Sequence, residues 1–365
     1  MRARSMAVPV LVATVLAAAA RPAMAQDPTR PGMLLGAEYR SISFGTGLGT
    51  KKVEEFAVPI GLTMPFGSRF SLDAGTYGFS AQRTDGAGAK TSISGVTDLL
   101  IRGTFQLKPD VAVLTVAVNV PTGHKLSGSD LGVAGAVATD LIAFPVSNFG
   151  SGLNVTTGLA LAAPVGGWAL GIAGSYRYSS RYQLDALTIR PGGEVRVRVG
   201  ADRIVGQGRV SLGLTYSTFA NDEIGGFSQS PGSRLIPQAS WSVPMGRNSS
   251  LALYAWDAYR KGQIAPDSGN RTQNTLSMGA VASLRTGRRN TFRPQVEVRS
   301  GSGGIDQPNS NAGWILGLIA RYQIVASDRL SLVPGVRFDT GSKKESGGNV
   351  SITGLSANLT MRASW

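Results

Sequence analysis

The sequence predicts an all-β fold, namely a transmembrane, antiparallel, up-and-down β-barrel of about 16 strands, with about 14 as the alternative count. Three observations predict it. The first residues have the features of an export signal, the rest of the chain alternates apolar with polar or small residues, and its connections are alternately short and long. Segments of about ten alternating residues, joined by short turns on one side and longer loops on the other, are typical of outer-membrane barrels.

Residues 1–25 are expected to be a cleaved signal peptide. Arg2 and Arg4 precede an uncharged apolar stretch at 8–20, and Ala23-Met24-Ala25 fits a small-x-small cleavage site. The apolar stretch is shorter than the roughly 20 residues of a membrane-spanning helix, which argues against a transmembrane anchor. Residues 26–365 are then expected to form one barrel domain in the outer membrane of a Gram-negative-type cell.

Composition excludes several classes of function. The chain has no cysteine and one histidine, so no thiolate or histidine-cluster metal site is expected, and no cofactor. The net charge is +14, but three of the arginines lie in the signal and no basic run exceeds two residues, so nucleic acid is not an expected partner. An enzyme acting on lipids would have to use His124, and no catalytic partner is evident near it. Lipopolysaccharide or anionic solutes are the partners that this charge favours.

Alternation assigns the charged residues of the strands to the barrel interior. In segments such as 194–200 and 330–339, every second residue is apolar and the residues between them are charged or small. An arginine facing lipid at the bilayer midplane costs about 2–4 kcal/mol, so these side chains should point inward. The expected lumen set is Asp98, Arg102, Arg177, Glu194, Arg196, Arg198, Arg285, Arg293, Glu297, Arg299, Arg321, Arg337, Asp339 and Arg362. They could line a pore that prefers anions, or form a network that plugs the barrel.

Loop lengths set the topology. Short turns are predicted near 66–67, 109–110, 165–166, 204–205, 245–246, 287–288 and 326–327. Longer connections are predicted near 45–52, 81–92, 181–193, 219–233, 261–272, 301–312 and 340–349. The alternation survives only if 122–151 is one outer connection, so 131–144 is interpreted as a short apolar helix or lid within it. An additional hairpin is the alternative. An even strand count places both termini in the periplasm.

The last segment is consistent with barrel assembly. Apolar residues alternate before the final aromatic residue, Trp365; they are Leu355, Ala357, Leu359, Met361 and Ala363. This pattern resembles the C-terminal signal that the barrel assembly machinery recognises, although Phe is the more usual last residue.

The aromatic residues near strand ends suit interfacial belts, with ligand stacking as the alternative. They are Trp168, Trp241, Trp314 and Tyr322.

One hairpin resembles a known family. Gly95, Thr97 and Asp98 begin a segment that leads through a tight turn to Pro121-Thr122-Gly123. This is similar to the Gly-x-Gly-Asp and Pro-Thr-Gly strands of outer-membrane channels from aromatic-compound (phenol) meta-cleavage pathways, which are related to FadL-type transporter barrels. Gly95, Asp98, Pro121, Thr122 and Gly123 match, and Thr97 replaces the second glycine. The resemblance implies a monomeric barrel for passive uptake of hydrophobic or aromatic molecules. Alternatively, these residues only begin and end two strands.

Three hypotheses follow from the sequence. The first is a channel for small hydrophobic or aromatic solutes, with a lid formed by 122–151. The second is a structural or surface-interaction barrel whose lumen is plugged by arginine–acid pairs and whose basic loops bind lipopolysaccharide. The third is a general porin for small anions. The channel for hydrophobic or aromatic solutes is the interpretation that we prefer from the sequence, and the other two are its alternatives.

Overall fold

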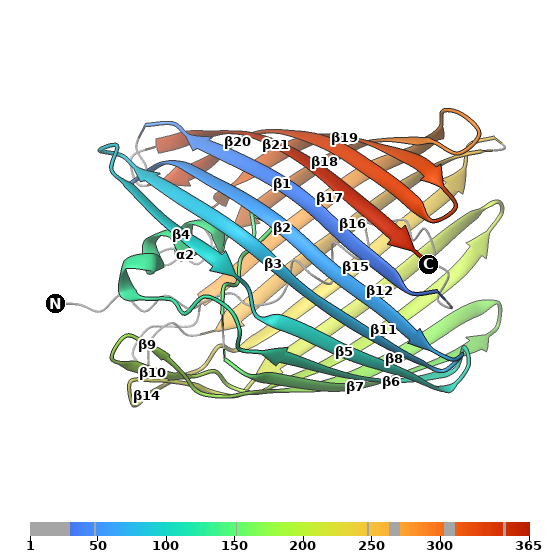
Figure 1. Ribbon diagram of the computed structural model, residues 1–365, viewed down its shortest axis with the longest axis horizontal. Coiled ribbons are helices and arrows are strands. Elements are labelled where there is room, and N and C mark those ends of the chain that lie inside the picture. Colours follow the sequence, from blue (N-terminus) through green and yellow to red (C-terminus); the bar gives the residue numbers. More distant parts are fainter. Residues whose placement is uncertain are drawn as a thin grey trace.

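The computed structural model describes residues 30–46, 49–150, 152–246, 248–262, 271–302, 311–345 and 348–365. The expected signal peptide, 1–25, lies outside them. Sixteen long antiparallel strands form a closed barrel (Figure 1), which confirms the predicted fold class and the higher count. The strands are β1(Gly32–Phe44), β2(Thr50–Phe66), β3(Phe70–Asp85), β4(Lys90–Val96) continued by β5(Leu99–Lys108), β6(Ala112–Val120), β7(Asn154–Val165), β8(Trp168–Ser179), β11(Glu194–Val205), β12(Gly208–Phe219), β15(Ser233–Pro244), β16(Ser249–Gly262), β17(Arg271–Arg285), β18(Thr291–Ser302), β19(Asn311–Ser327), β20(Leu330–Glu345) and β21(Gly348–Ser364).

The barrel closes where β1 pairs with both β2 and β21. The Trp365 N–H donates to the Pro31 carbonyl oxygen at 3.3 Å, so the two described ends of the chain meet at one rim. We call this rim the turn end, because the tight turns that precede β3, β6, β8 and β12 lie there (Figure 1). Asp110 and Gly206 make two of these turns with φ near +60°, a conformation in which glycine carries no Cβ penalty.

The two faces of the wall follow the predicted alternation. On β2, Phe56 and Ile60 are exposed on the outer surface, whereas Val53, Glu55 and Ala57 are buried on the inner side. Cross-strand pairing carries these faces from strand to strand, because partners in register share a face. The outer surface is therefore apolar around the barrel, as a lipid-facing surface would be. No helix among the described ranges is both long and apolar enough to cross a membrane.

The rim opposite the turn end, here the loop end, differs from the prediction in detail. The predicted loop at 340–349 is mostly strand, since β20 continues to Glu345 and β21 begins at Gly348. The predicted loop at 81–92 is likewise shortened by β3 and β4. These strand ends could not be recognised from alternation. They are rich in polar residues, because a strand that extends beyond the apolar belt no longer needs apolar residues at every second position. Most of the predicted loops 261–272 and 301–312 lies outside the described residues.

Two further loops carry hairpins of their own. β9(Tyr182–Leu184) with β10(Leu187–Arg190), and β13(Asp222–Ile224) with β14(Phe227–Gln229), form a separate four-stranded sheet at the loop end (Figure 1). The sequence predicted irregular loops at 181–193 and 219–233. Short strands of three or four residues are hard to read from alternation, because so few positions give no clear period.

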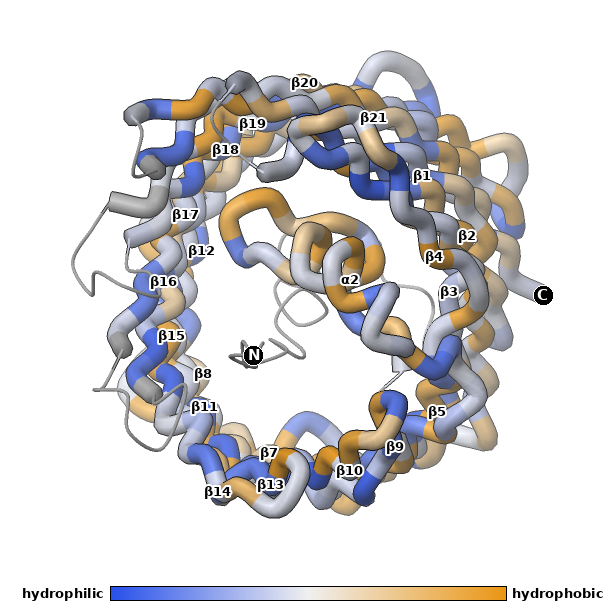
Figure 2. The backbone as a smooth tube through the Cα atoms, turned by 90° about the vertical axis from the view of Figure 1, so that its left-hand side faces the viewer, coloured by the Kyte–Doolittle hydropathy of each residue, from blue (hydrophilic) through white to orange (hydrophobic). Residues whose placement is uncertain are grey.

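The connection between β6 and β7 folds into the barrel. We call residues 121–153 the inner loop; it contains the 3₁₀ turn η1(Gly128–Asp130) and the helix α2(Leu131–Val137). Figure 2, seen from the loop end, shows α2 inside the ring of strands, beside β3 and β4. The predicted helix is confirmed, and an additional hairpin is wrong. The segment is not a lid over the mouth, because it packs against the inner wall of the barrel.

An apolar cluster holds the inner loop to that wall. Its members are buried side chains of the loop and the inner faces of β1 to β4, β19 and β21: Ile42, Val53, Ala57, Phe79, Ala81, Ile93, Val133, Val137, Leu141, Ile142, Phe144, Val146, Phe149, Ile315 and Ile352. Phe79 and Phe149 pack with ring centroids 4.6 Å apart. The inner faces of these strands are apolar where the loop covers them, so the loop completes a core rather than resting in open solvent.

Candidate functional site

The inner loop begins at a break in the wall. The segment predicted as one strand from Gly95 is interrupted at Thr97 and Asp98, between β4 and β5. Asp98 is buried, and its carboxylate accepts hydrogen bonds from the Gly123 N–H and the Asn119 side-chain amide, both at 2.9 Å. Thr122 Oγ1 accepts the Leu99 N–H at 3.0 Å. The break therefore gives the root of the loop a fixed carboxylate to bind.

The family-like residues meet at this root. A Cβ on Gly95 would lie 3.1 Å from the Cβ of His124, and one on Gly123 would lie 2.6 Å from Asp98 Oδ1, so both positions need the close approach that glycine allows. Pro121 follows β6 directly. Thr97, the departure from the family pattern, accepts the Tyr77 N–H on its hydroxyl at 3.0 Å. Together these residues hold the loop root in place, and they account for the motif without any solute.

Two buried polar side chains of the wall hold the far part of the loop. Glu55 accepts the Val146 N–H at 2.7 Å, and Arg40 donates to the Ala143 carbonyl oxygen at 2.6 Å while pairing with Asp339 at 3.0 Å. Because Glu55, Arg40 and Asp339 are nearly inaccessible, these hydrogen bonds fix the loop at defined points.

Charged side chains on the wall beside the loop pair with one another. Arg337 pairs with Asp339 at 2.7 Å and with Glu297 at 3.1 Å, and Arg299 also donates to Glu297. These side chains come from β18 and β20, next to the strands that carry the loop. Here the predicted arginine–acid network exists, and each of its arginines has a carboxylate partner.

The opposite wall carries an excess of arginine, and we call its five lumen-facing arginines, Arg177, Arg196, Arg198, Arg234 and Arg260, the arginine wall. Glu194 is the strand carboxylate among them, paired with Arg196 at 2.6 Å and with Arg177 at 3.4 Å. No hydrogen bond or ion pair links Arg198, Arg234 or Arg260 to another described residue. Asp140 of the inner loop and Asp222 of β13 act on this wall at longer range. The wall is therefore net positive.

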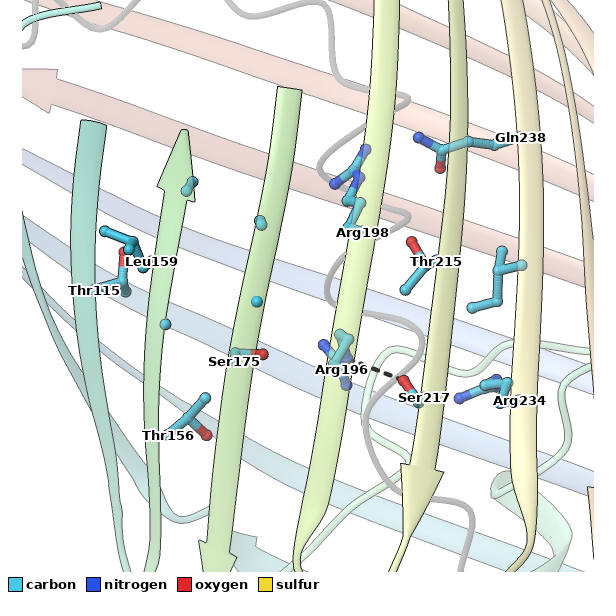
Figure 3. A pocket seen from close by; sticks show the side chains of 15 residues that line it. Thr115, Thr156, Leu159, Ser175, Arg196, Arg198, Thr215, Ser217, Arg234 and Gln238 are labelled. Carbon is cyan, nitrogen blue, oxygen red and sulfur yellow. Dashed lines mark hydrogen bonds between the residues drawn. The ribbon is translucent and has the colours of Figure 1, made fainter. Parts of the chain in front are cut away.

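A pocket of about 270 Å³ lies against the arginine wall (Figure 3). Arg196, Arg198 and Arg234 line it together with hydroxyls and small apolar side chains from β6, β7, β8, β12 and β15. Arg196 donates to Ser217 at 3.3 Å, the contact drawn as a dashed line. In Figure 2 the strands β8, β11 and β15 stand across the ring from α2, so the pocket faces the side that the inner loop leaves uncovered.

The other predicted residues occupy several environments. Arg102 pairs with Asp73 at 2.7 Å on the inner face of β5, and Arg321 donates to Gln295 at 3.0 Å. Arg285 lies at the turn end and donates to Asn248 and the Gly287 carbonyl oxygen, so it belongs to a turn rather than to a mid-lumen surface. Arg293 faces Arg321 across β18 and β19, Arg362 faces Ser331, and the Trp365 side chain is exposed after β21.

The sequence-based set missed Arg40, Glu55, Arg234 and Arg260. Arg234 and Arg260 alternate with Leu235 and Tyr259, which are exposed on the outer face, so closer reading of period two could have found both. Arg40 offered less signal, because its alternation with Tyr39 and Ser41 does not separate an apolar from a polar face. Its role depends on the inner loop, which no local pattern reveals.

His124 does not form a nucleophile–base pair with the nearby serine. Its Nε2 lies 3.2 Å from Asp130, and Ser127 donates its hydroxyl to the same carboxylate at 2.9 Å. Burial disfavours the charge of Asp130, but the Ser127 and His124 hydrogen bonds outweigh it and lower the pKa of this carboxyl. Within the described ranges, no three His, Asp or Glu side chains are grouped as a metal site would need.

No protein-family model and none of the curated proteins matches the chain. Solved structures with a similar fold include a Pseudomonas aeruginosa FadL homologue (10% identity, 92% of this chain and 90% of that chain, TM-score 0.46). They also include the CymD monoaromatic hydrocarbon channel (14%, 93% and 91%, 0.44) and an anion-selective porin from Comamonas acidovorans (15%, 92% and 98%, 0.45). Identities and scores this low assign no solute and no role to this chain.

Proposed function

We propose that this protein is an outer-membrane channel through which small solutes diffuse passively, and that it favours anions. The observation that carries the proposal is the arginine wall, which faces a pocket on the side of the lumen opposite the inner loop. A cluster of guanidinium groups with few carboxylates raises the local concentration of anions and lowers that of cations. Rings of basic side chains have this effect in anion-conducting pores.

The distribution of charge supports a channel over a plugged barrel. A plug would cover the lumen and pair its charges, as the network around Glu297 and Asp339 does beside the inner loop. Across the lumen, Arg198 is exposed and has no such partner. A guanidinium without a protein partner requires water, because leaving it dry and unpaired is costly. The inner loop then narrows the passage from one side.

Neutral hydrophobic or aromatic solutes, which the family resemblance implies, are the alternative cargo. The geometry supports them less, because Asp98, Thr122 and Gly123 hold the loop root and do not line the pocket. The apolar outer surface suits lipid, and the terminal Trp365 suits recognition by the barrel assembly machinery. Contact with lipopolysaccharide and a monomeric state belong to the same proposal.

Efflux from proteoliposomes tests the channel. Vesicles are loaded with labelled succinate, a neutral pentose or cadaverine, and the purified protein should release succinate fastest and cadaverine slowest. Release in the reverse order would contradict the anion preference. No release of any solute, from the native protein or from a variant lacking residues 125–150, would contradict the channel and favour the plugged structural barrel.

A further inference from the structure

The arginine wall contains an ordered row. Cross-strand register places Ser175, Arg196, Ser217, Arg234 and Arg260 side by side on β8, β11, β12, β15 and β16. Because residues in register share a face, all five point into the lumen. Neighbouring strands lie about 4.8 Å apart, so Arg196 and Arg234 flank Ser217 at a separation of roughly 10 Å between backbones. Figure 3 shows the two guanidinium groups on either side of the serine hydroxyl.

The row has unused hydrogen-bond donors. Arg196 shares its guanidinium between Glu194 and Ser217, but Arg234 and Arg260 have no partner among the described residues, and the Arg234 Nε is both buried and unpaired. A buried guanidinium without an acceptor is unfavourable, and an anion that enters the row relieves that cost. A planar carboxylate fits best, since its two oxygens match the donor fork of arginine.

An apolar surface adjoins the row toward the turn end. The next lumen-facing positions on these strands are Ala173, Arg198, Thr215 and Ile236. Ala160 lines the same pocket, and most of the lining beyond the guanidinium groups is carbon. An aromatic ring could rest on Ile236 and stack against the plane of Arg198. At about 270 Å³ the pocket is below the usual size for drug-like ligands, which limits the guest to a small molecule.

We propose that this pocket is a binding site for small aromatic carboxylates on their way through the barrel. The carboxylate lies between Arg196 and Arg234 and accepts from Ser217, and the ring lies over Ile236. The proposal deepens the proposed function and rests on it, since it assigns the anion preference to one place in the lumen. Binding is expected to be weak, because a solute that must leave the channel cannot be held tightly.

Single-channel recording with benzoate as the probe tests the site. Benzoate added to protein in planar bilayers with KCl should reduce the current in a saturable way, whereas acetate and benzyl alcohol should do so only at much higher concentrations. Arg196→Gln or Arg234→Gln should raise the half-blocking concentration of benzoate about 10-fold or more, since a hydrogen bond to a charged group contributes about 1.5–3 kcal/mol and 1.4 kcal/mol is tenfold. Ile236→Ser should raise the half-blocking concentration of benzoate and leave that of acetate unchanged.

Arg293→Gln is the matched control, because Arg293 is another lumen-facing arginine without a described partner, but on β18. If Arg293→Gln raises the half-blocking concentration of benzoate as much as Arg234→Gln does, the effect is one of general electrostatics and the proposed site is contradicted. A channel that conducts but ignores benzoate also overturns the site, while leaving the proposed function intact. If the native protein does not conduct, calorimetric titration of the folded protein with benzoate decides: saturable binding that Arg234→Gln removes supports the site, and no binding overturns it.

Discussion

Removing the Asp98 carboxylate should release the inner loop from the wall. Asp98→Ala deletes the acceptor for the Gly123 N–H and the Asn119 amide, each bound at 2.9 Å. Asn119 lies on β6, so only the Gly123 bond joins the loop to the wall, and a hydrogen bond to a charged group contributes about 1.5–3 kcal/mol. Once the carboxylate is gone, the Gly123 N–H gains more from water than from the docked position. At the lower figure, the undocked population should rise about 10-fold.

Thiol labelling measures this population directly. The chain has no cysteine, and Val137 of α2 is fully buried, so Val137→Cys places one reporter under the docked loop. The rate of maleimide labelling in vesicles should rise about 10-fold or more when Asp98→Ala is added. Asp73→Ala is the matched control, because Asp73 is also a lumen carboxylate but pairs with Arg102 and not with the loop. Equal labelling rates in the Asp98 and Asp73 variants, with the barrel still folded, would refute the anchor.

Three further predictions concern the loop and its charges. Phe144→Ala removes a side chain that is 1% exposed and should lower the stability of the docked loop by about 3–5 kcal/mol. Hydrogen exchange at the Ala143 and Val146 amides should then be faster. Unchanged exchange would argue that the loop does not depend on the apolar cluster. Arg40→Leu breaks a buried ion pair and should lower the free energy of unfolding in urea by about 3 kcal/mol. Arg102→Leu breaks an exposed ion pair and should lower it by under about 1 kcal/mol. Similar losses in the two variants would contradict the role of Arg40 as a buried anchor of the loop. Because the pKa of Asp130 is lowered in the folded state, its stabilising effect is complete above the ordinary pKa of aspartate and is lost as the pH falls through the folded value. Amide exchange at Ser127 should accelerate under those acidic conditions, and Asp130→Asn should abolish that pH dependence; a dependence that persists in the variant would assign it to another group.

Alternation was sufficient to predict which way most charged side chains point. Arg196 and Arg337 lie between apolar neighbours that face outward, and the cost of placing an arginine in lipid leaves one choice. Alternation could not distinguish an open lumen from a plugged one. Arg337 forms ion pairs with two carboxylates, whereas Arg198 forms none with the described residues, although both point inward. Asp339 lies two residues along the same strand, but Glu297 comes from β18, and alternation carries no information about which strands bring their charges together.

Loop parity predicted one long connection containing a helix, but not where it goes. The strand break at Thr97 and Asp98, which admits the loop root, looks like ordinary strand in the sequence. The apolar inner faces of β2 and β3 contradict a water-filled lumen only if it is known that Val53 and Phe79 point inward. The sequence does contain a signal for the loop folding inside. It is the presence of apolar residues such as Val53 and Phe79 on an inner strand face that is otherwise small and polar.

The most direct test of the account is the current through single molecules of the purified protein in a planar bilayer under a KCl gradient. We expect steady conductance with a reversal potential of the sign set by chloride, and larger conductance when residues 125–150 are deleted. A closed barrel in both forms, or a reversal potential set by potassium, would contradict the claim that the lumen is an anion-favouring passage between the inner loop and the arginine wall.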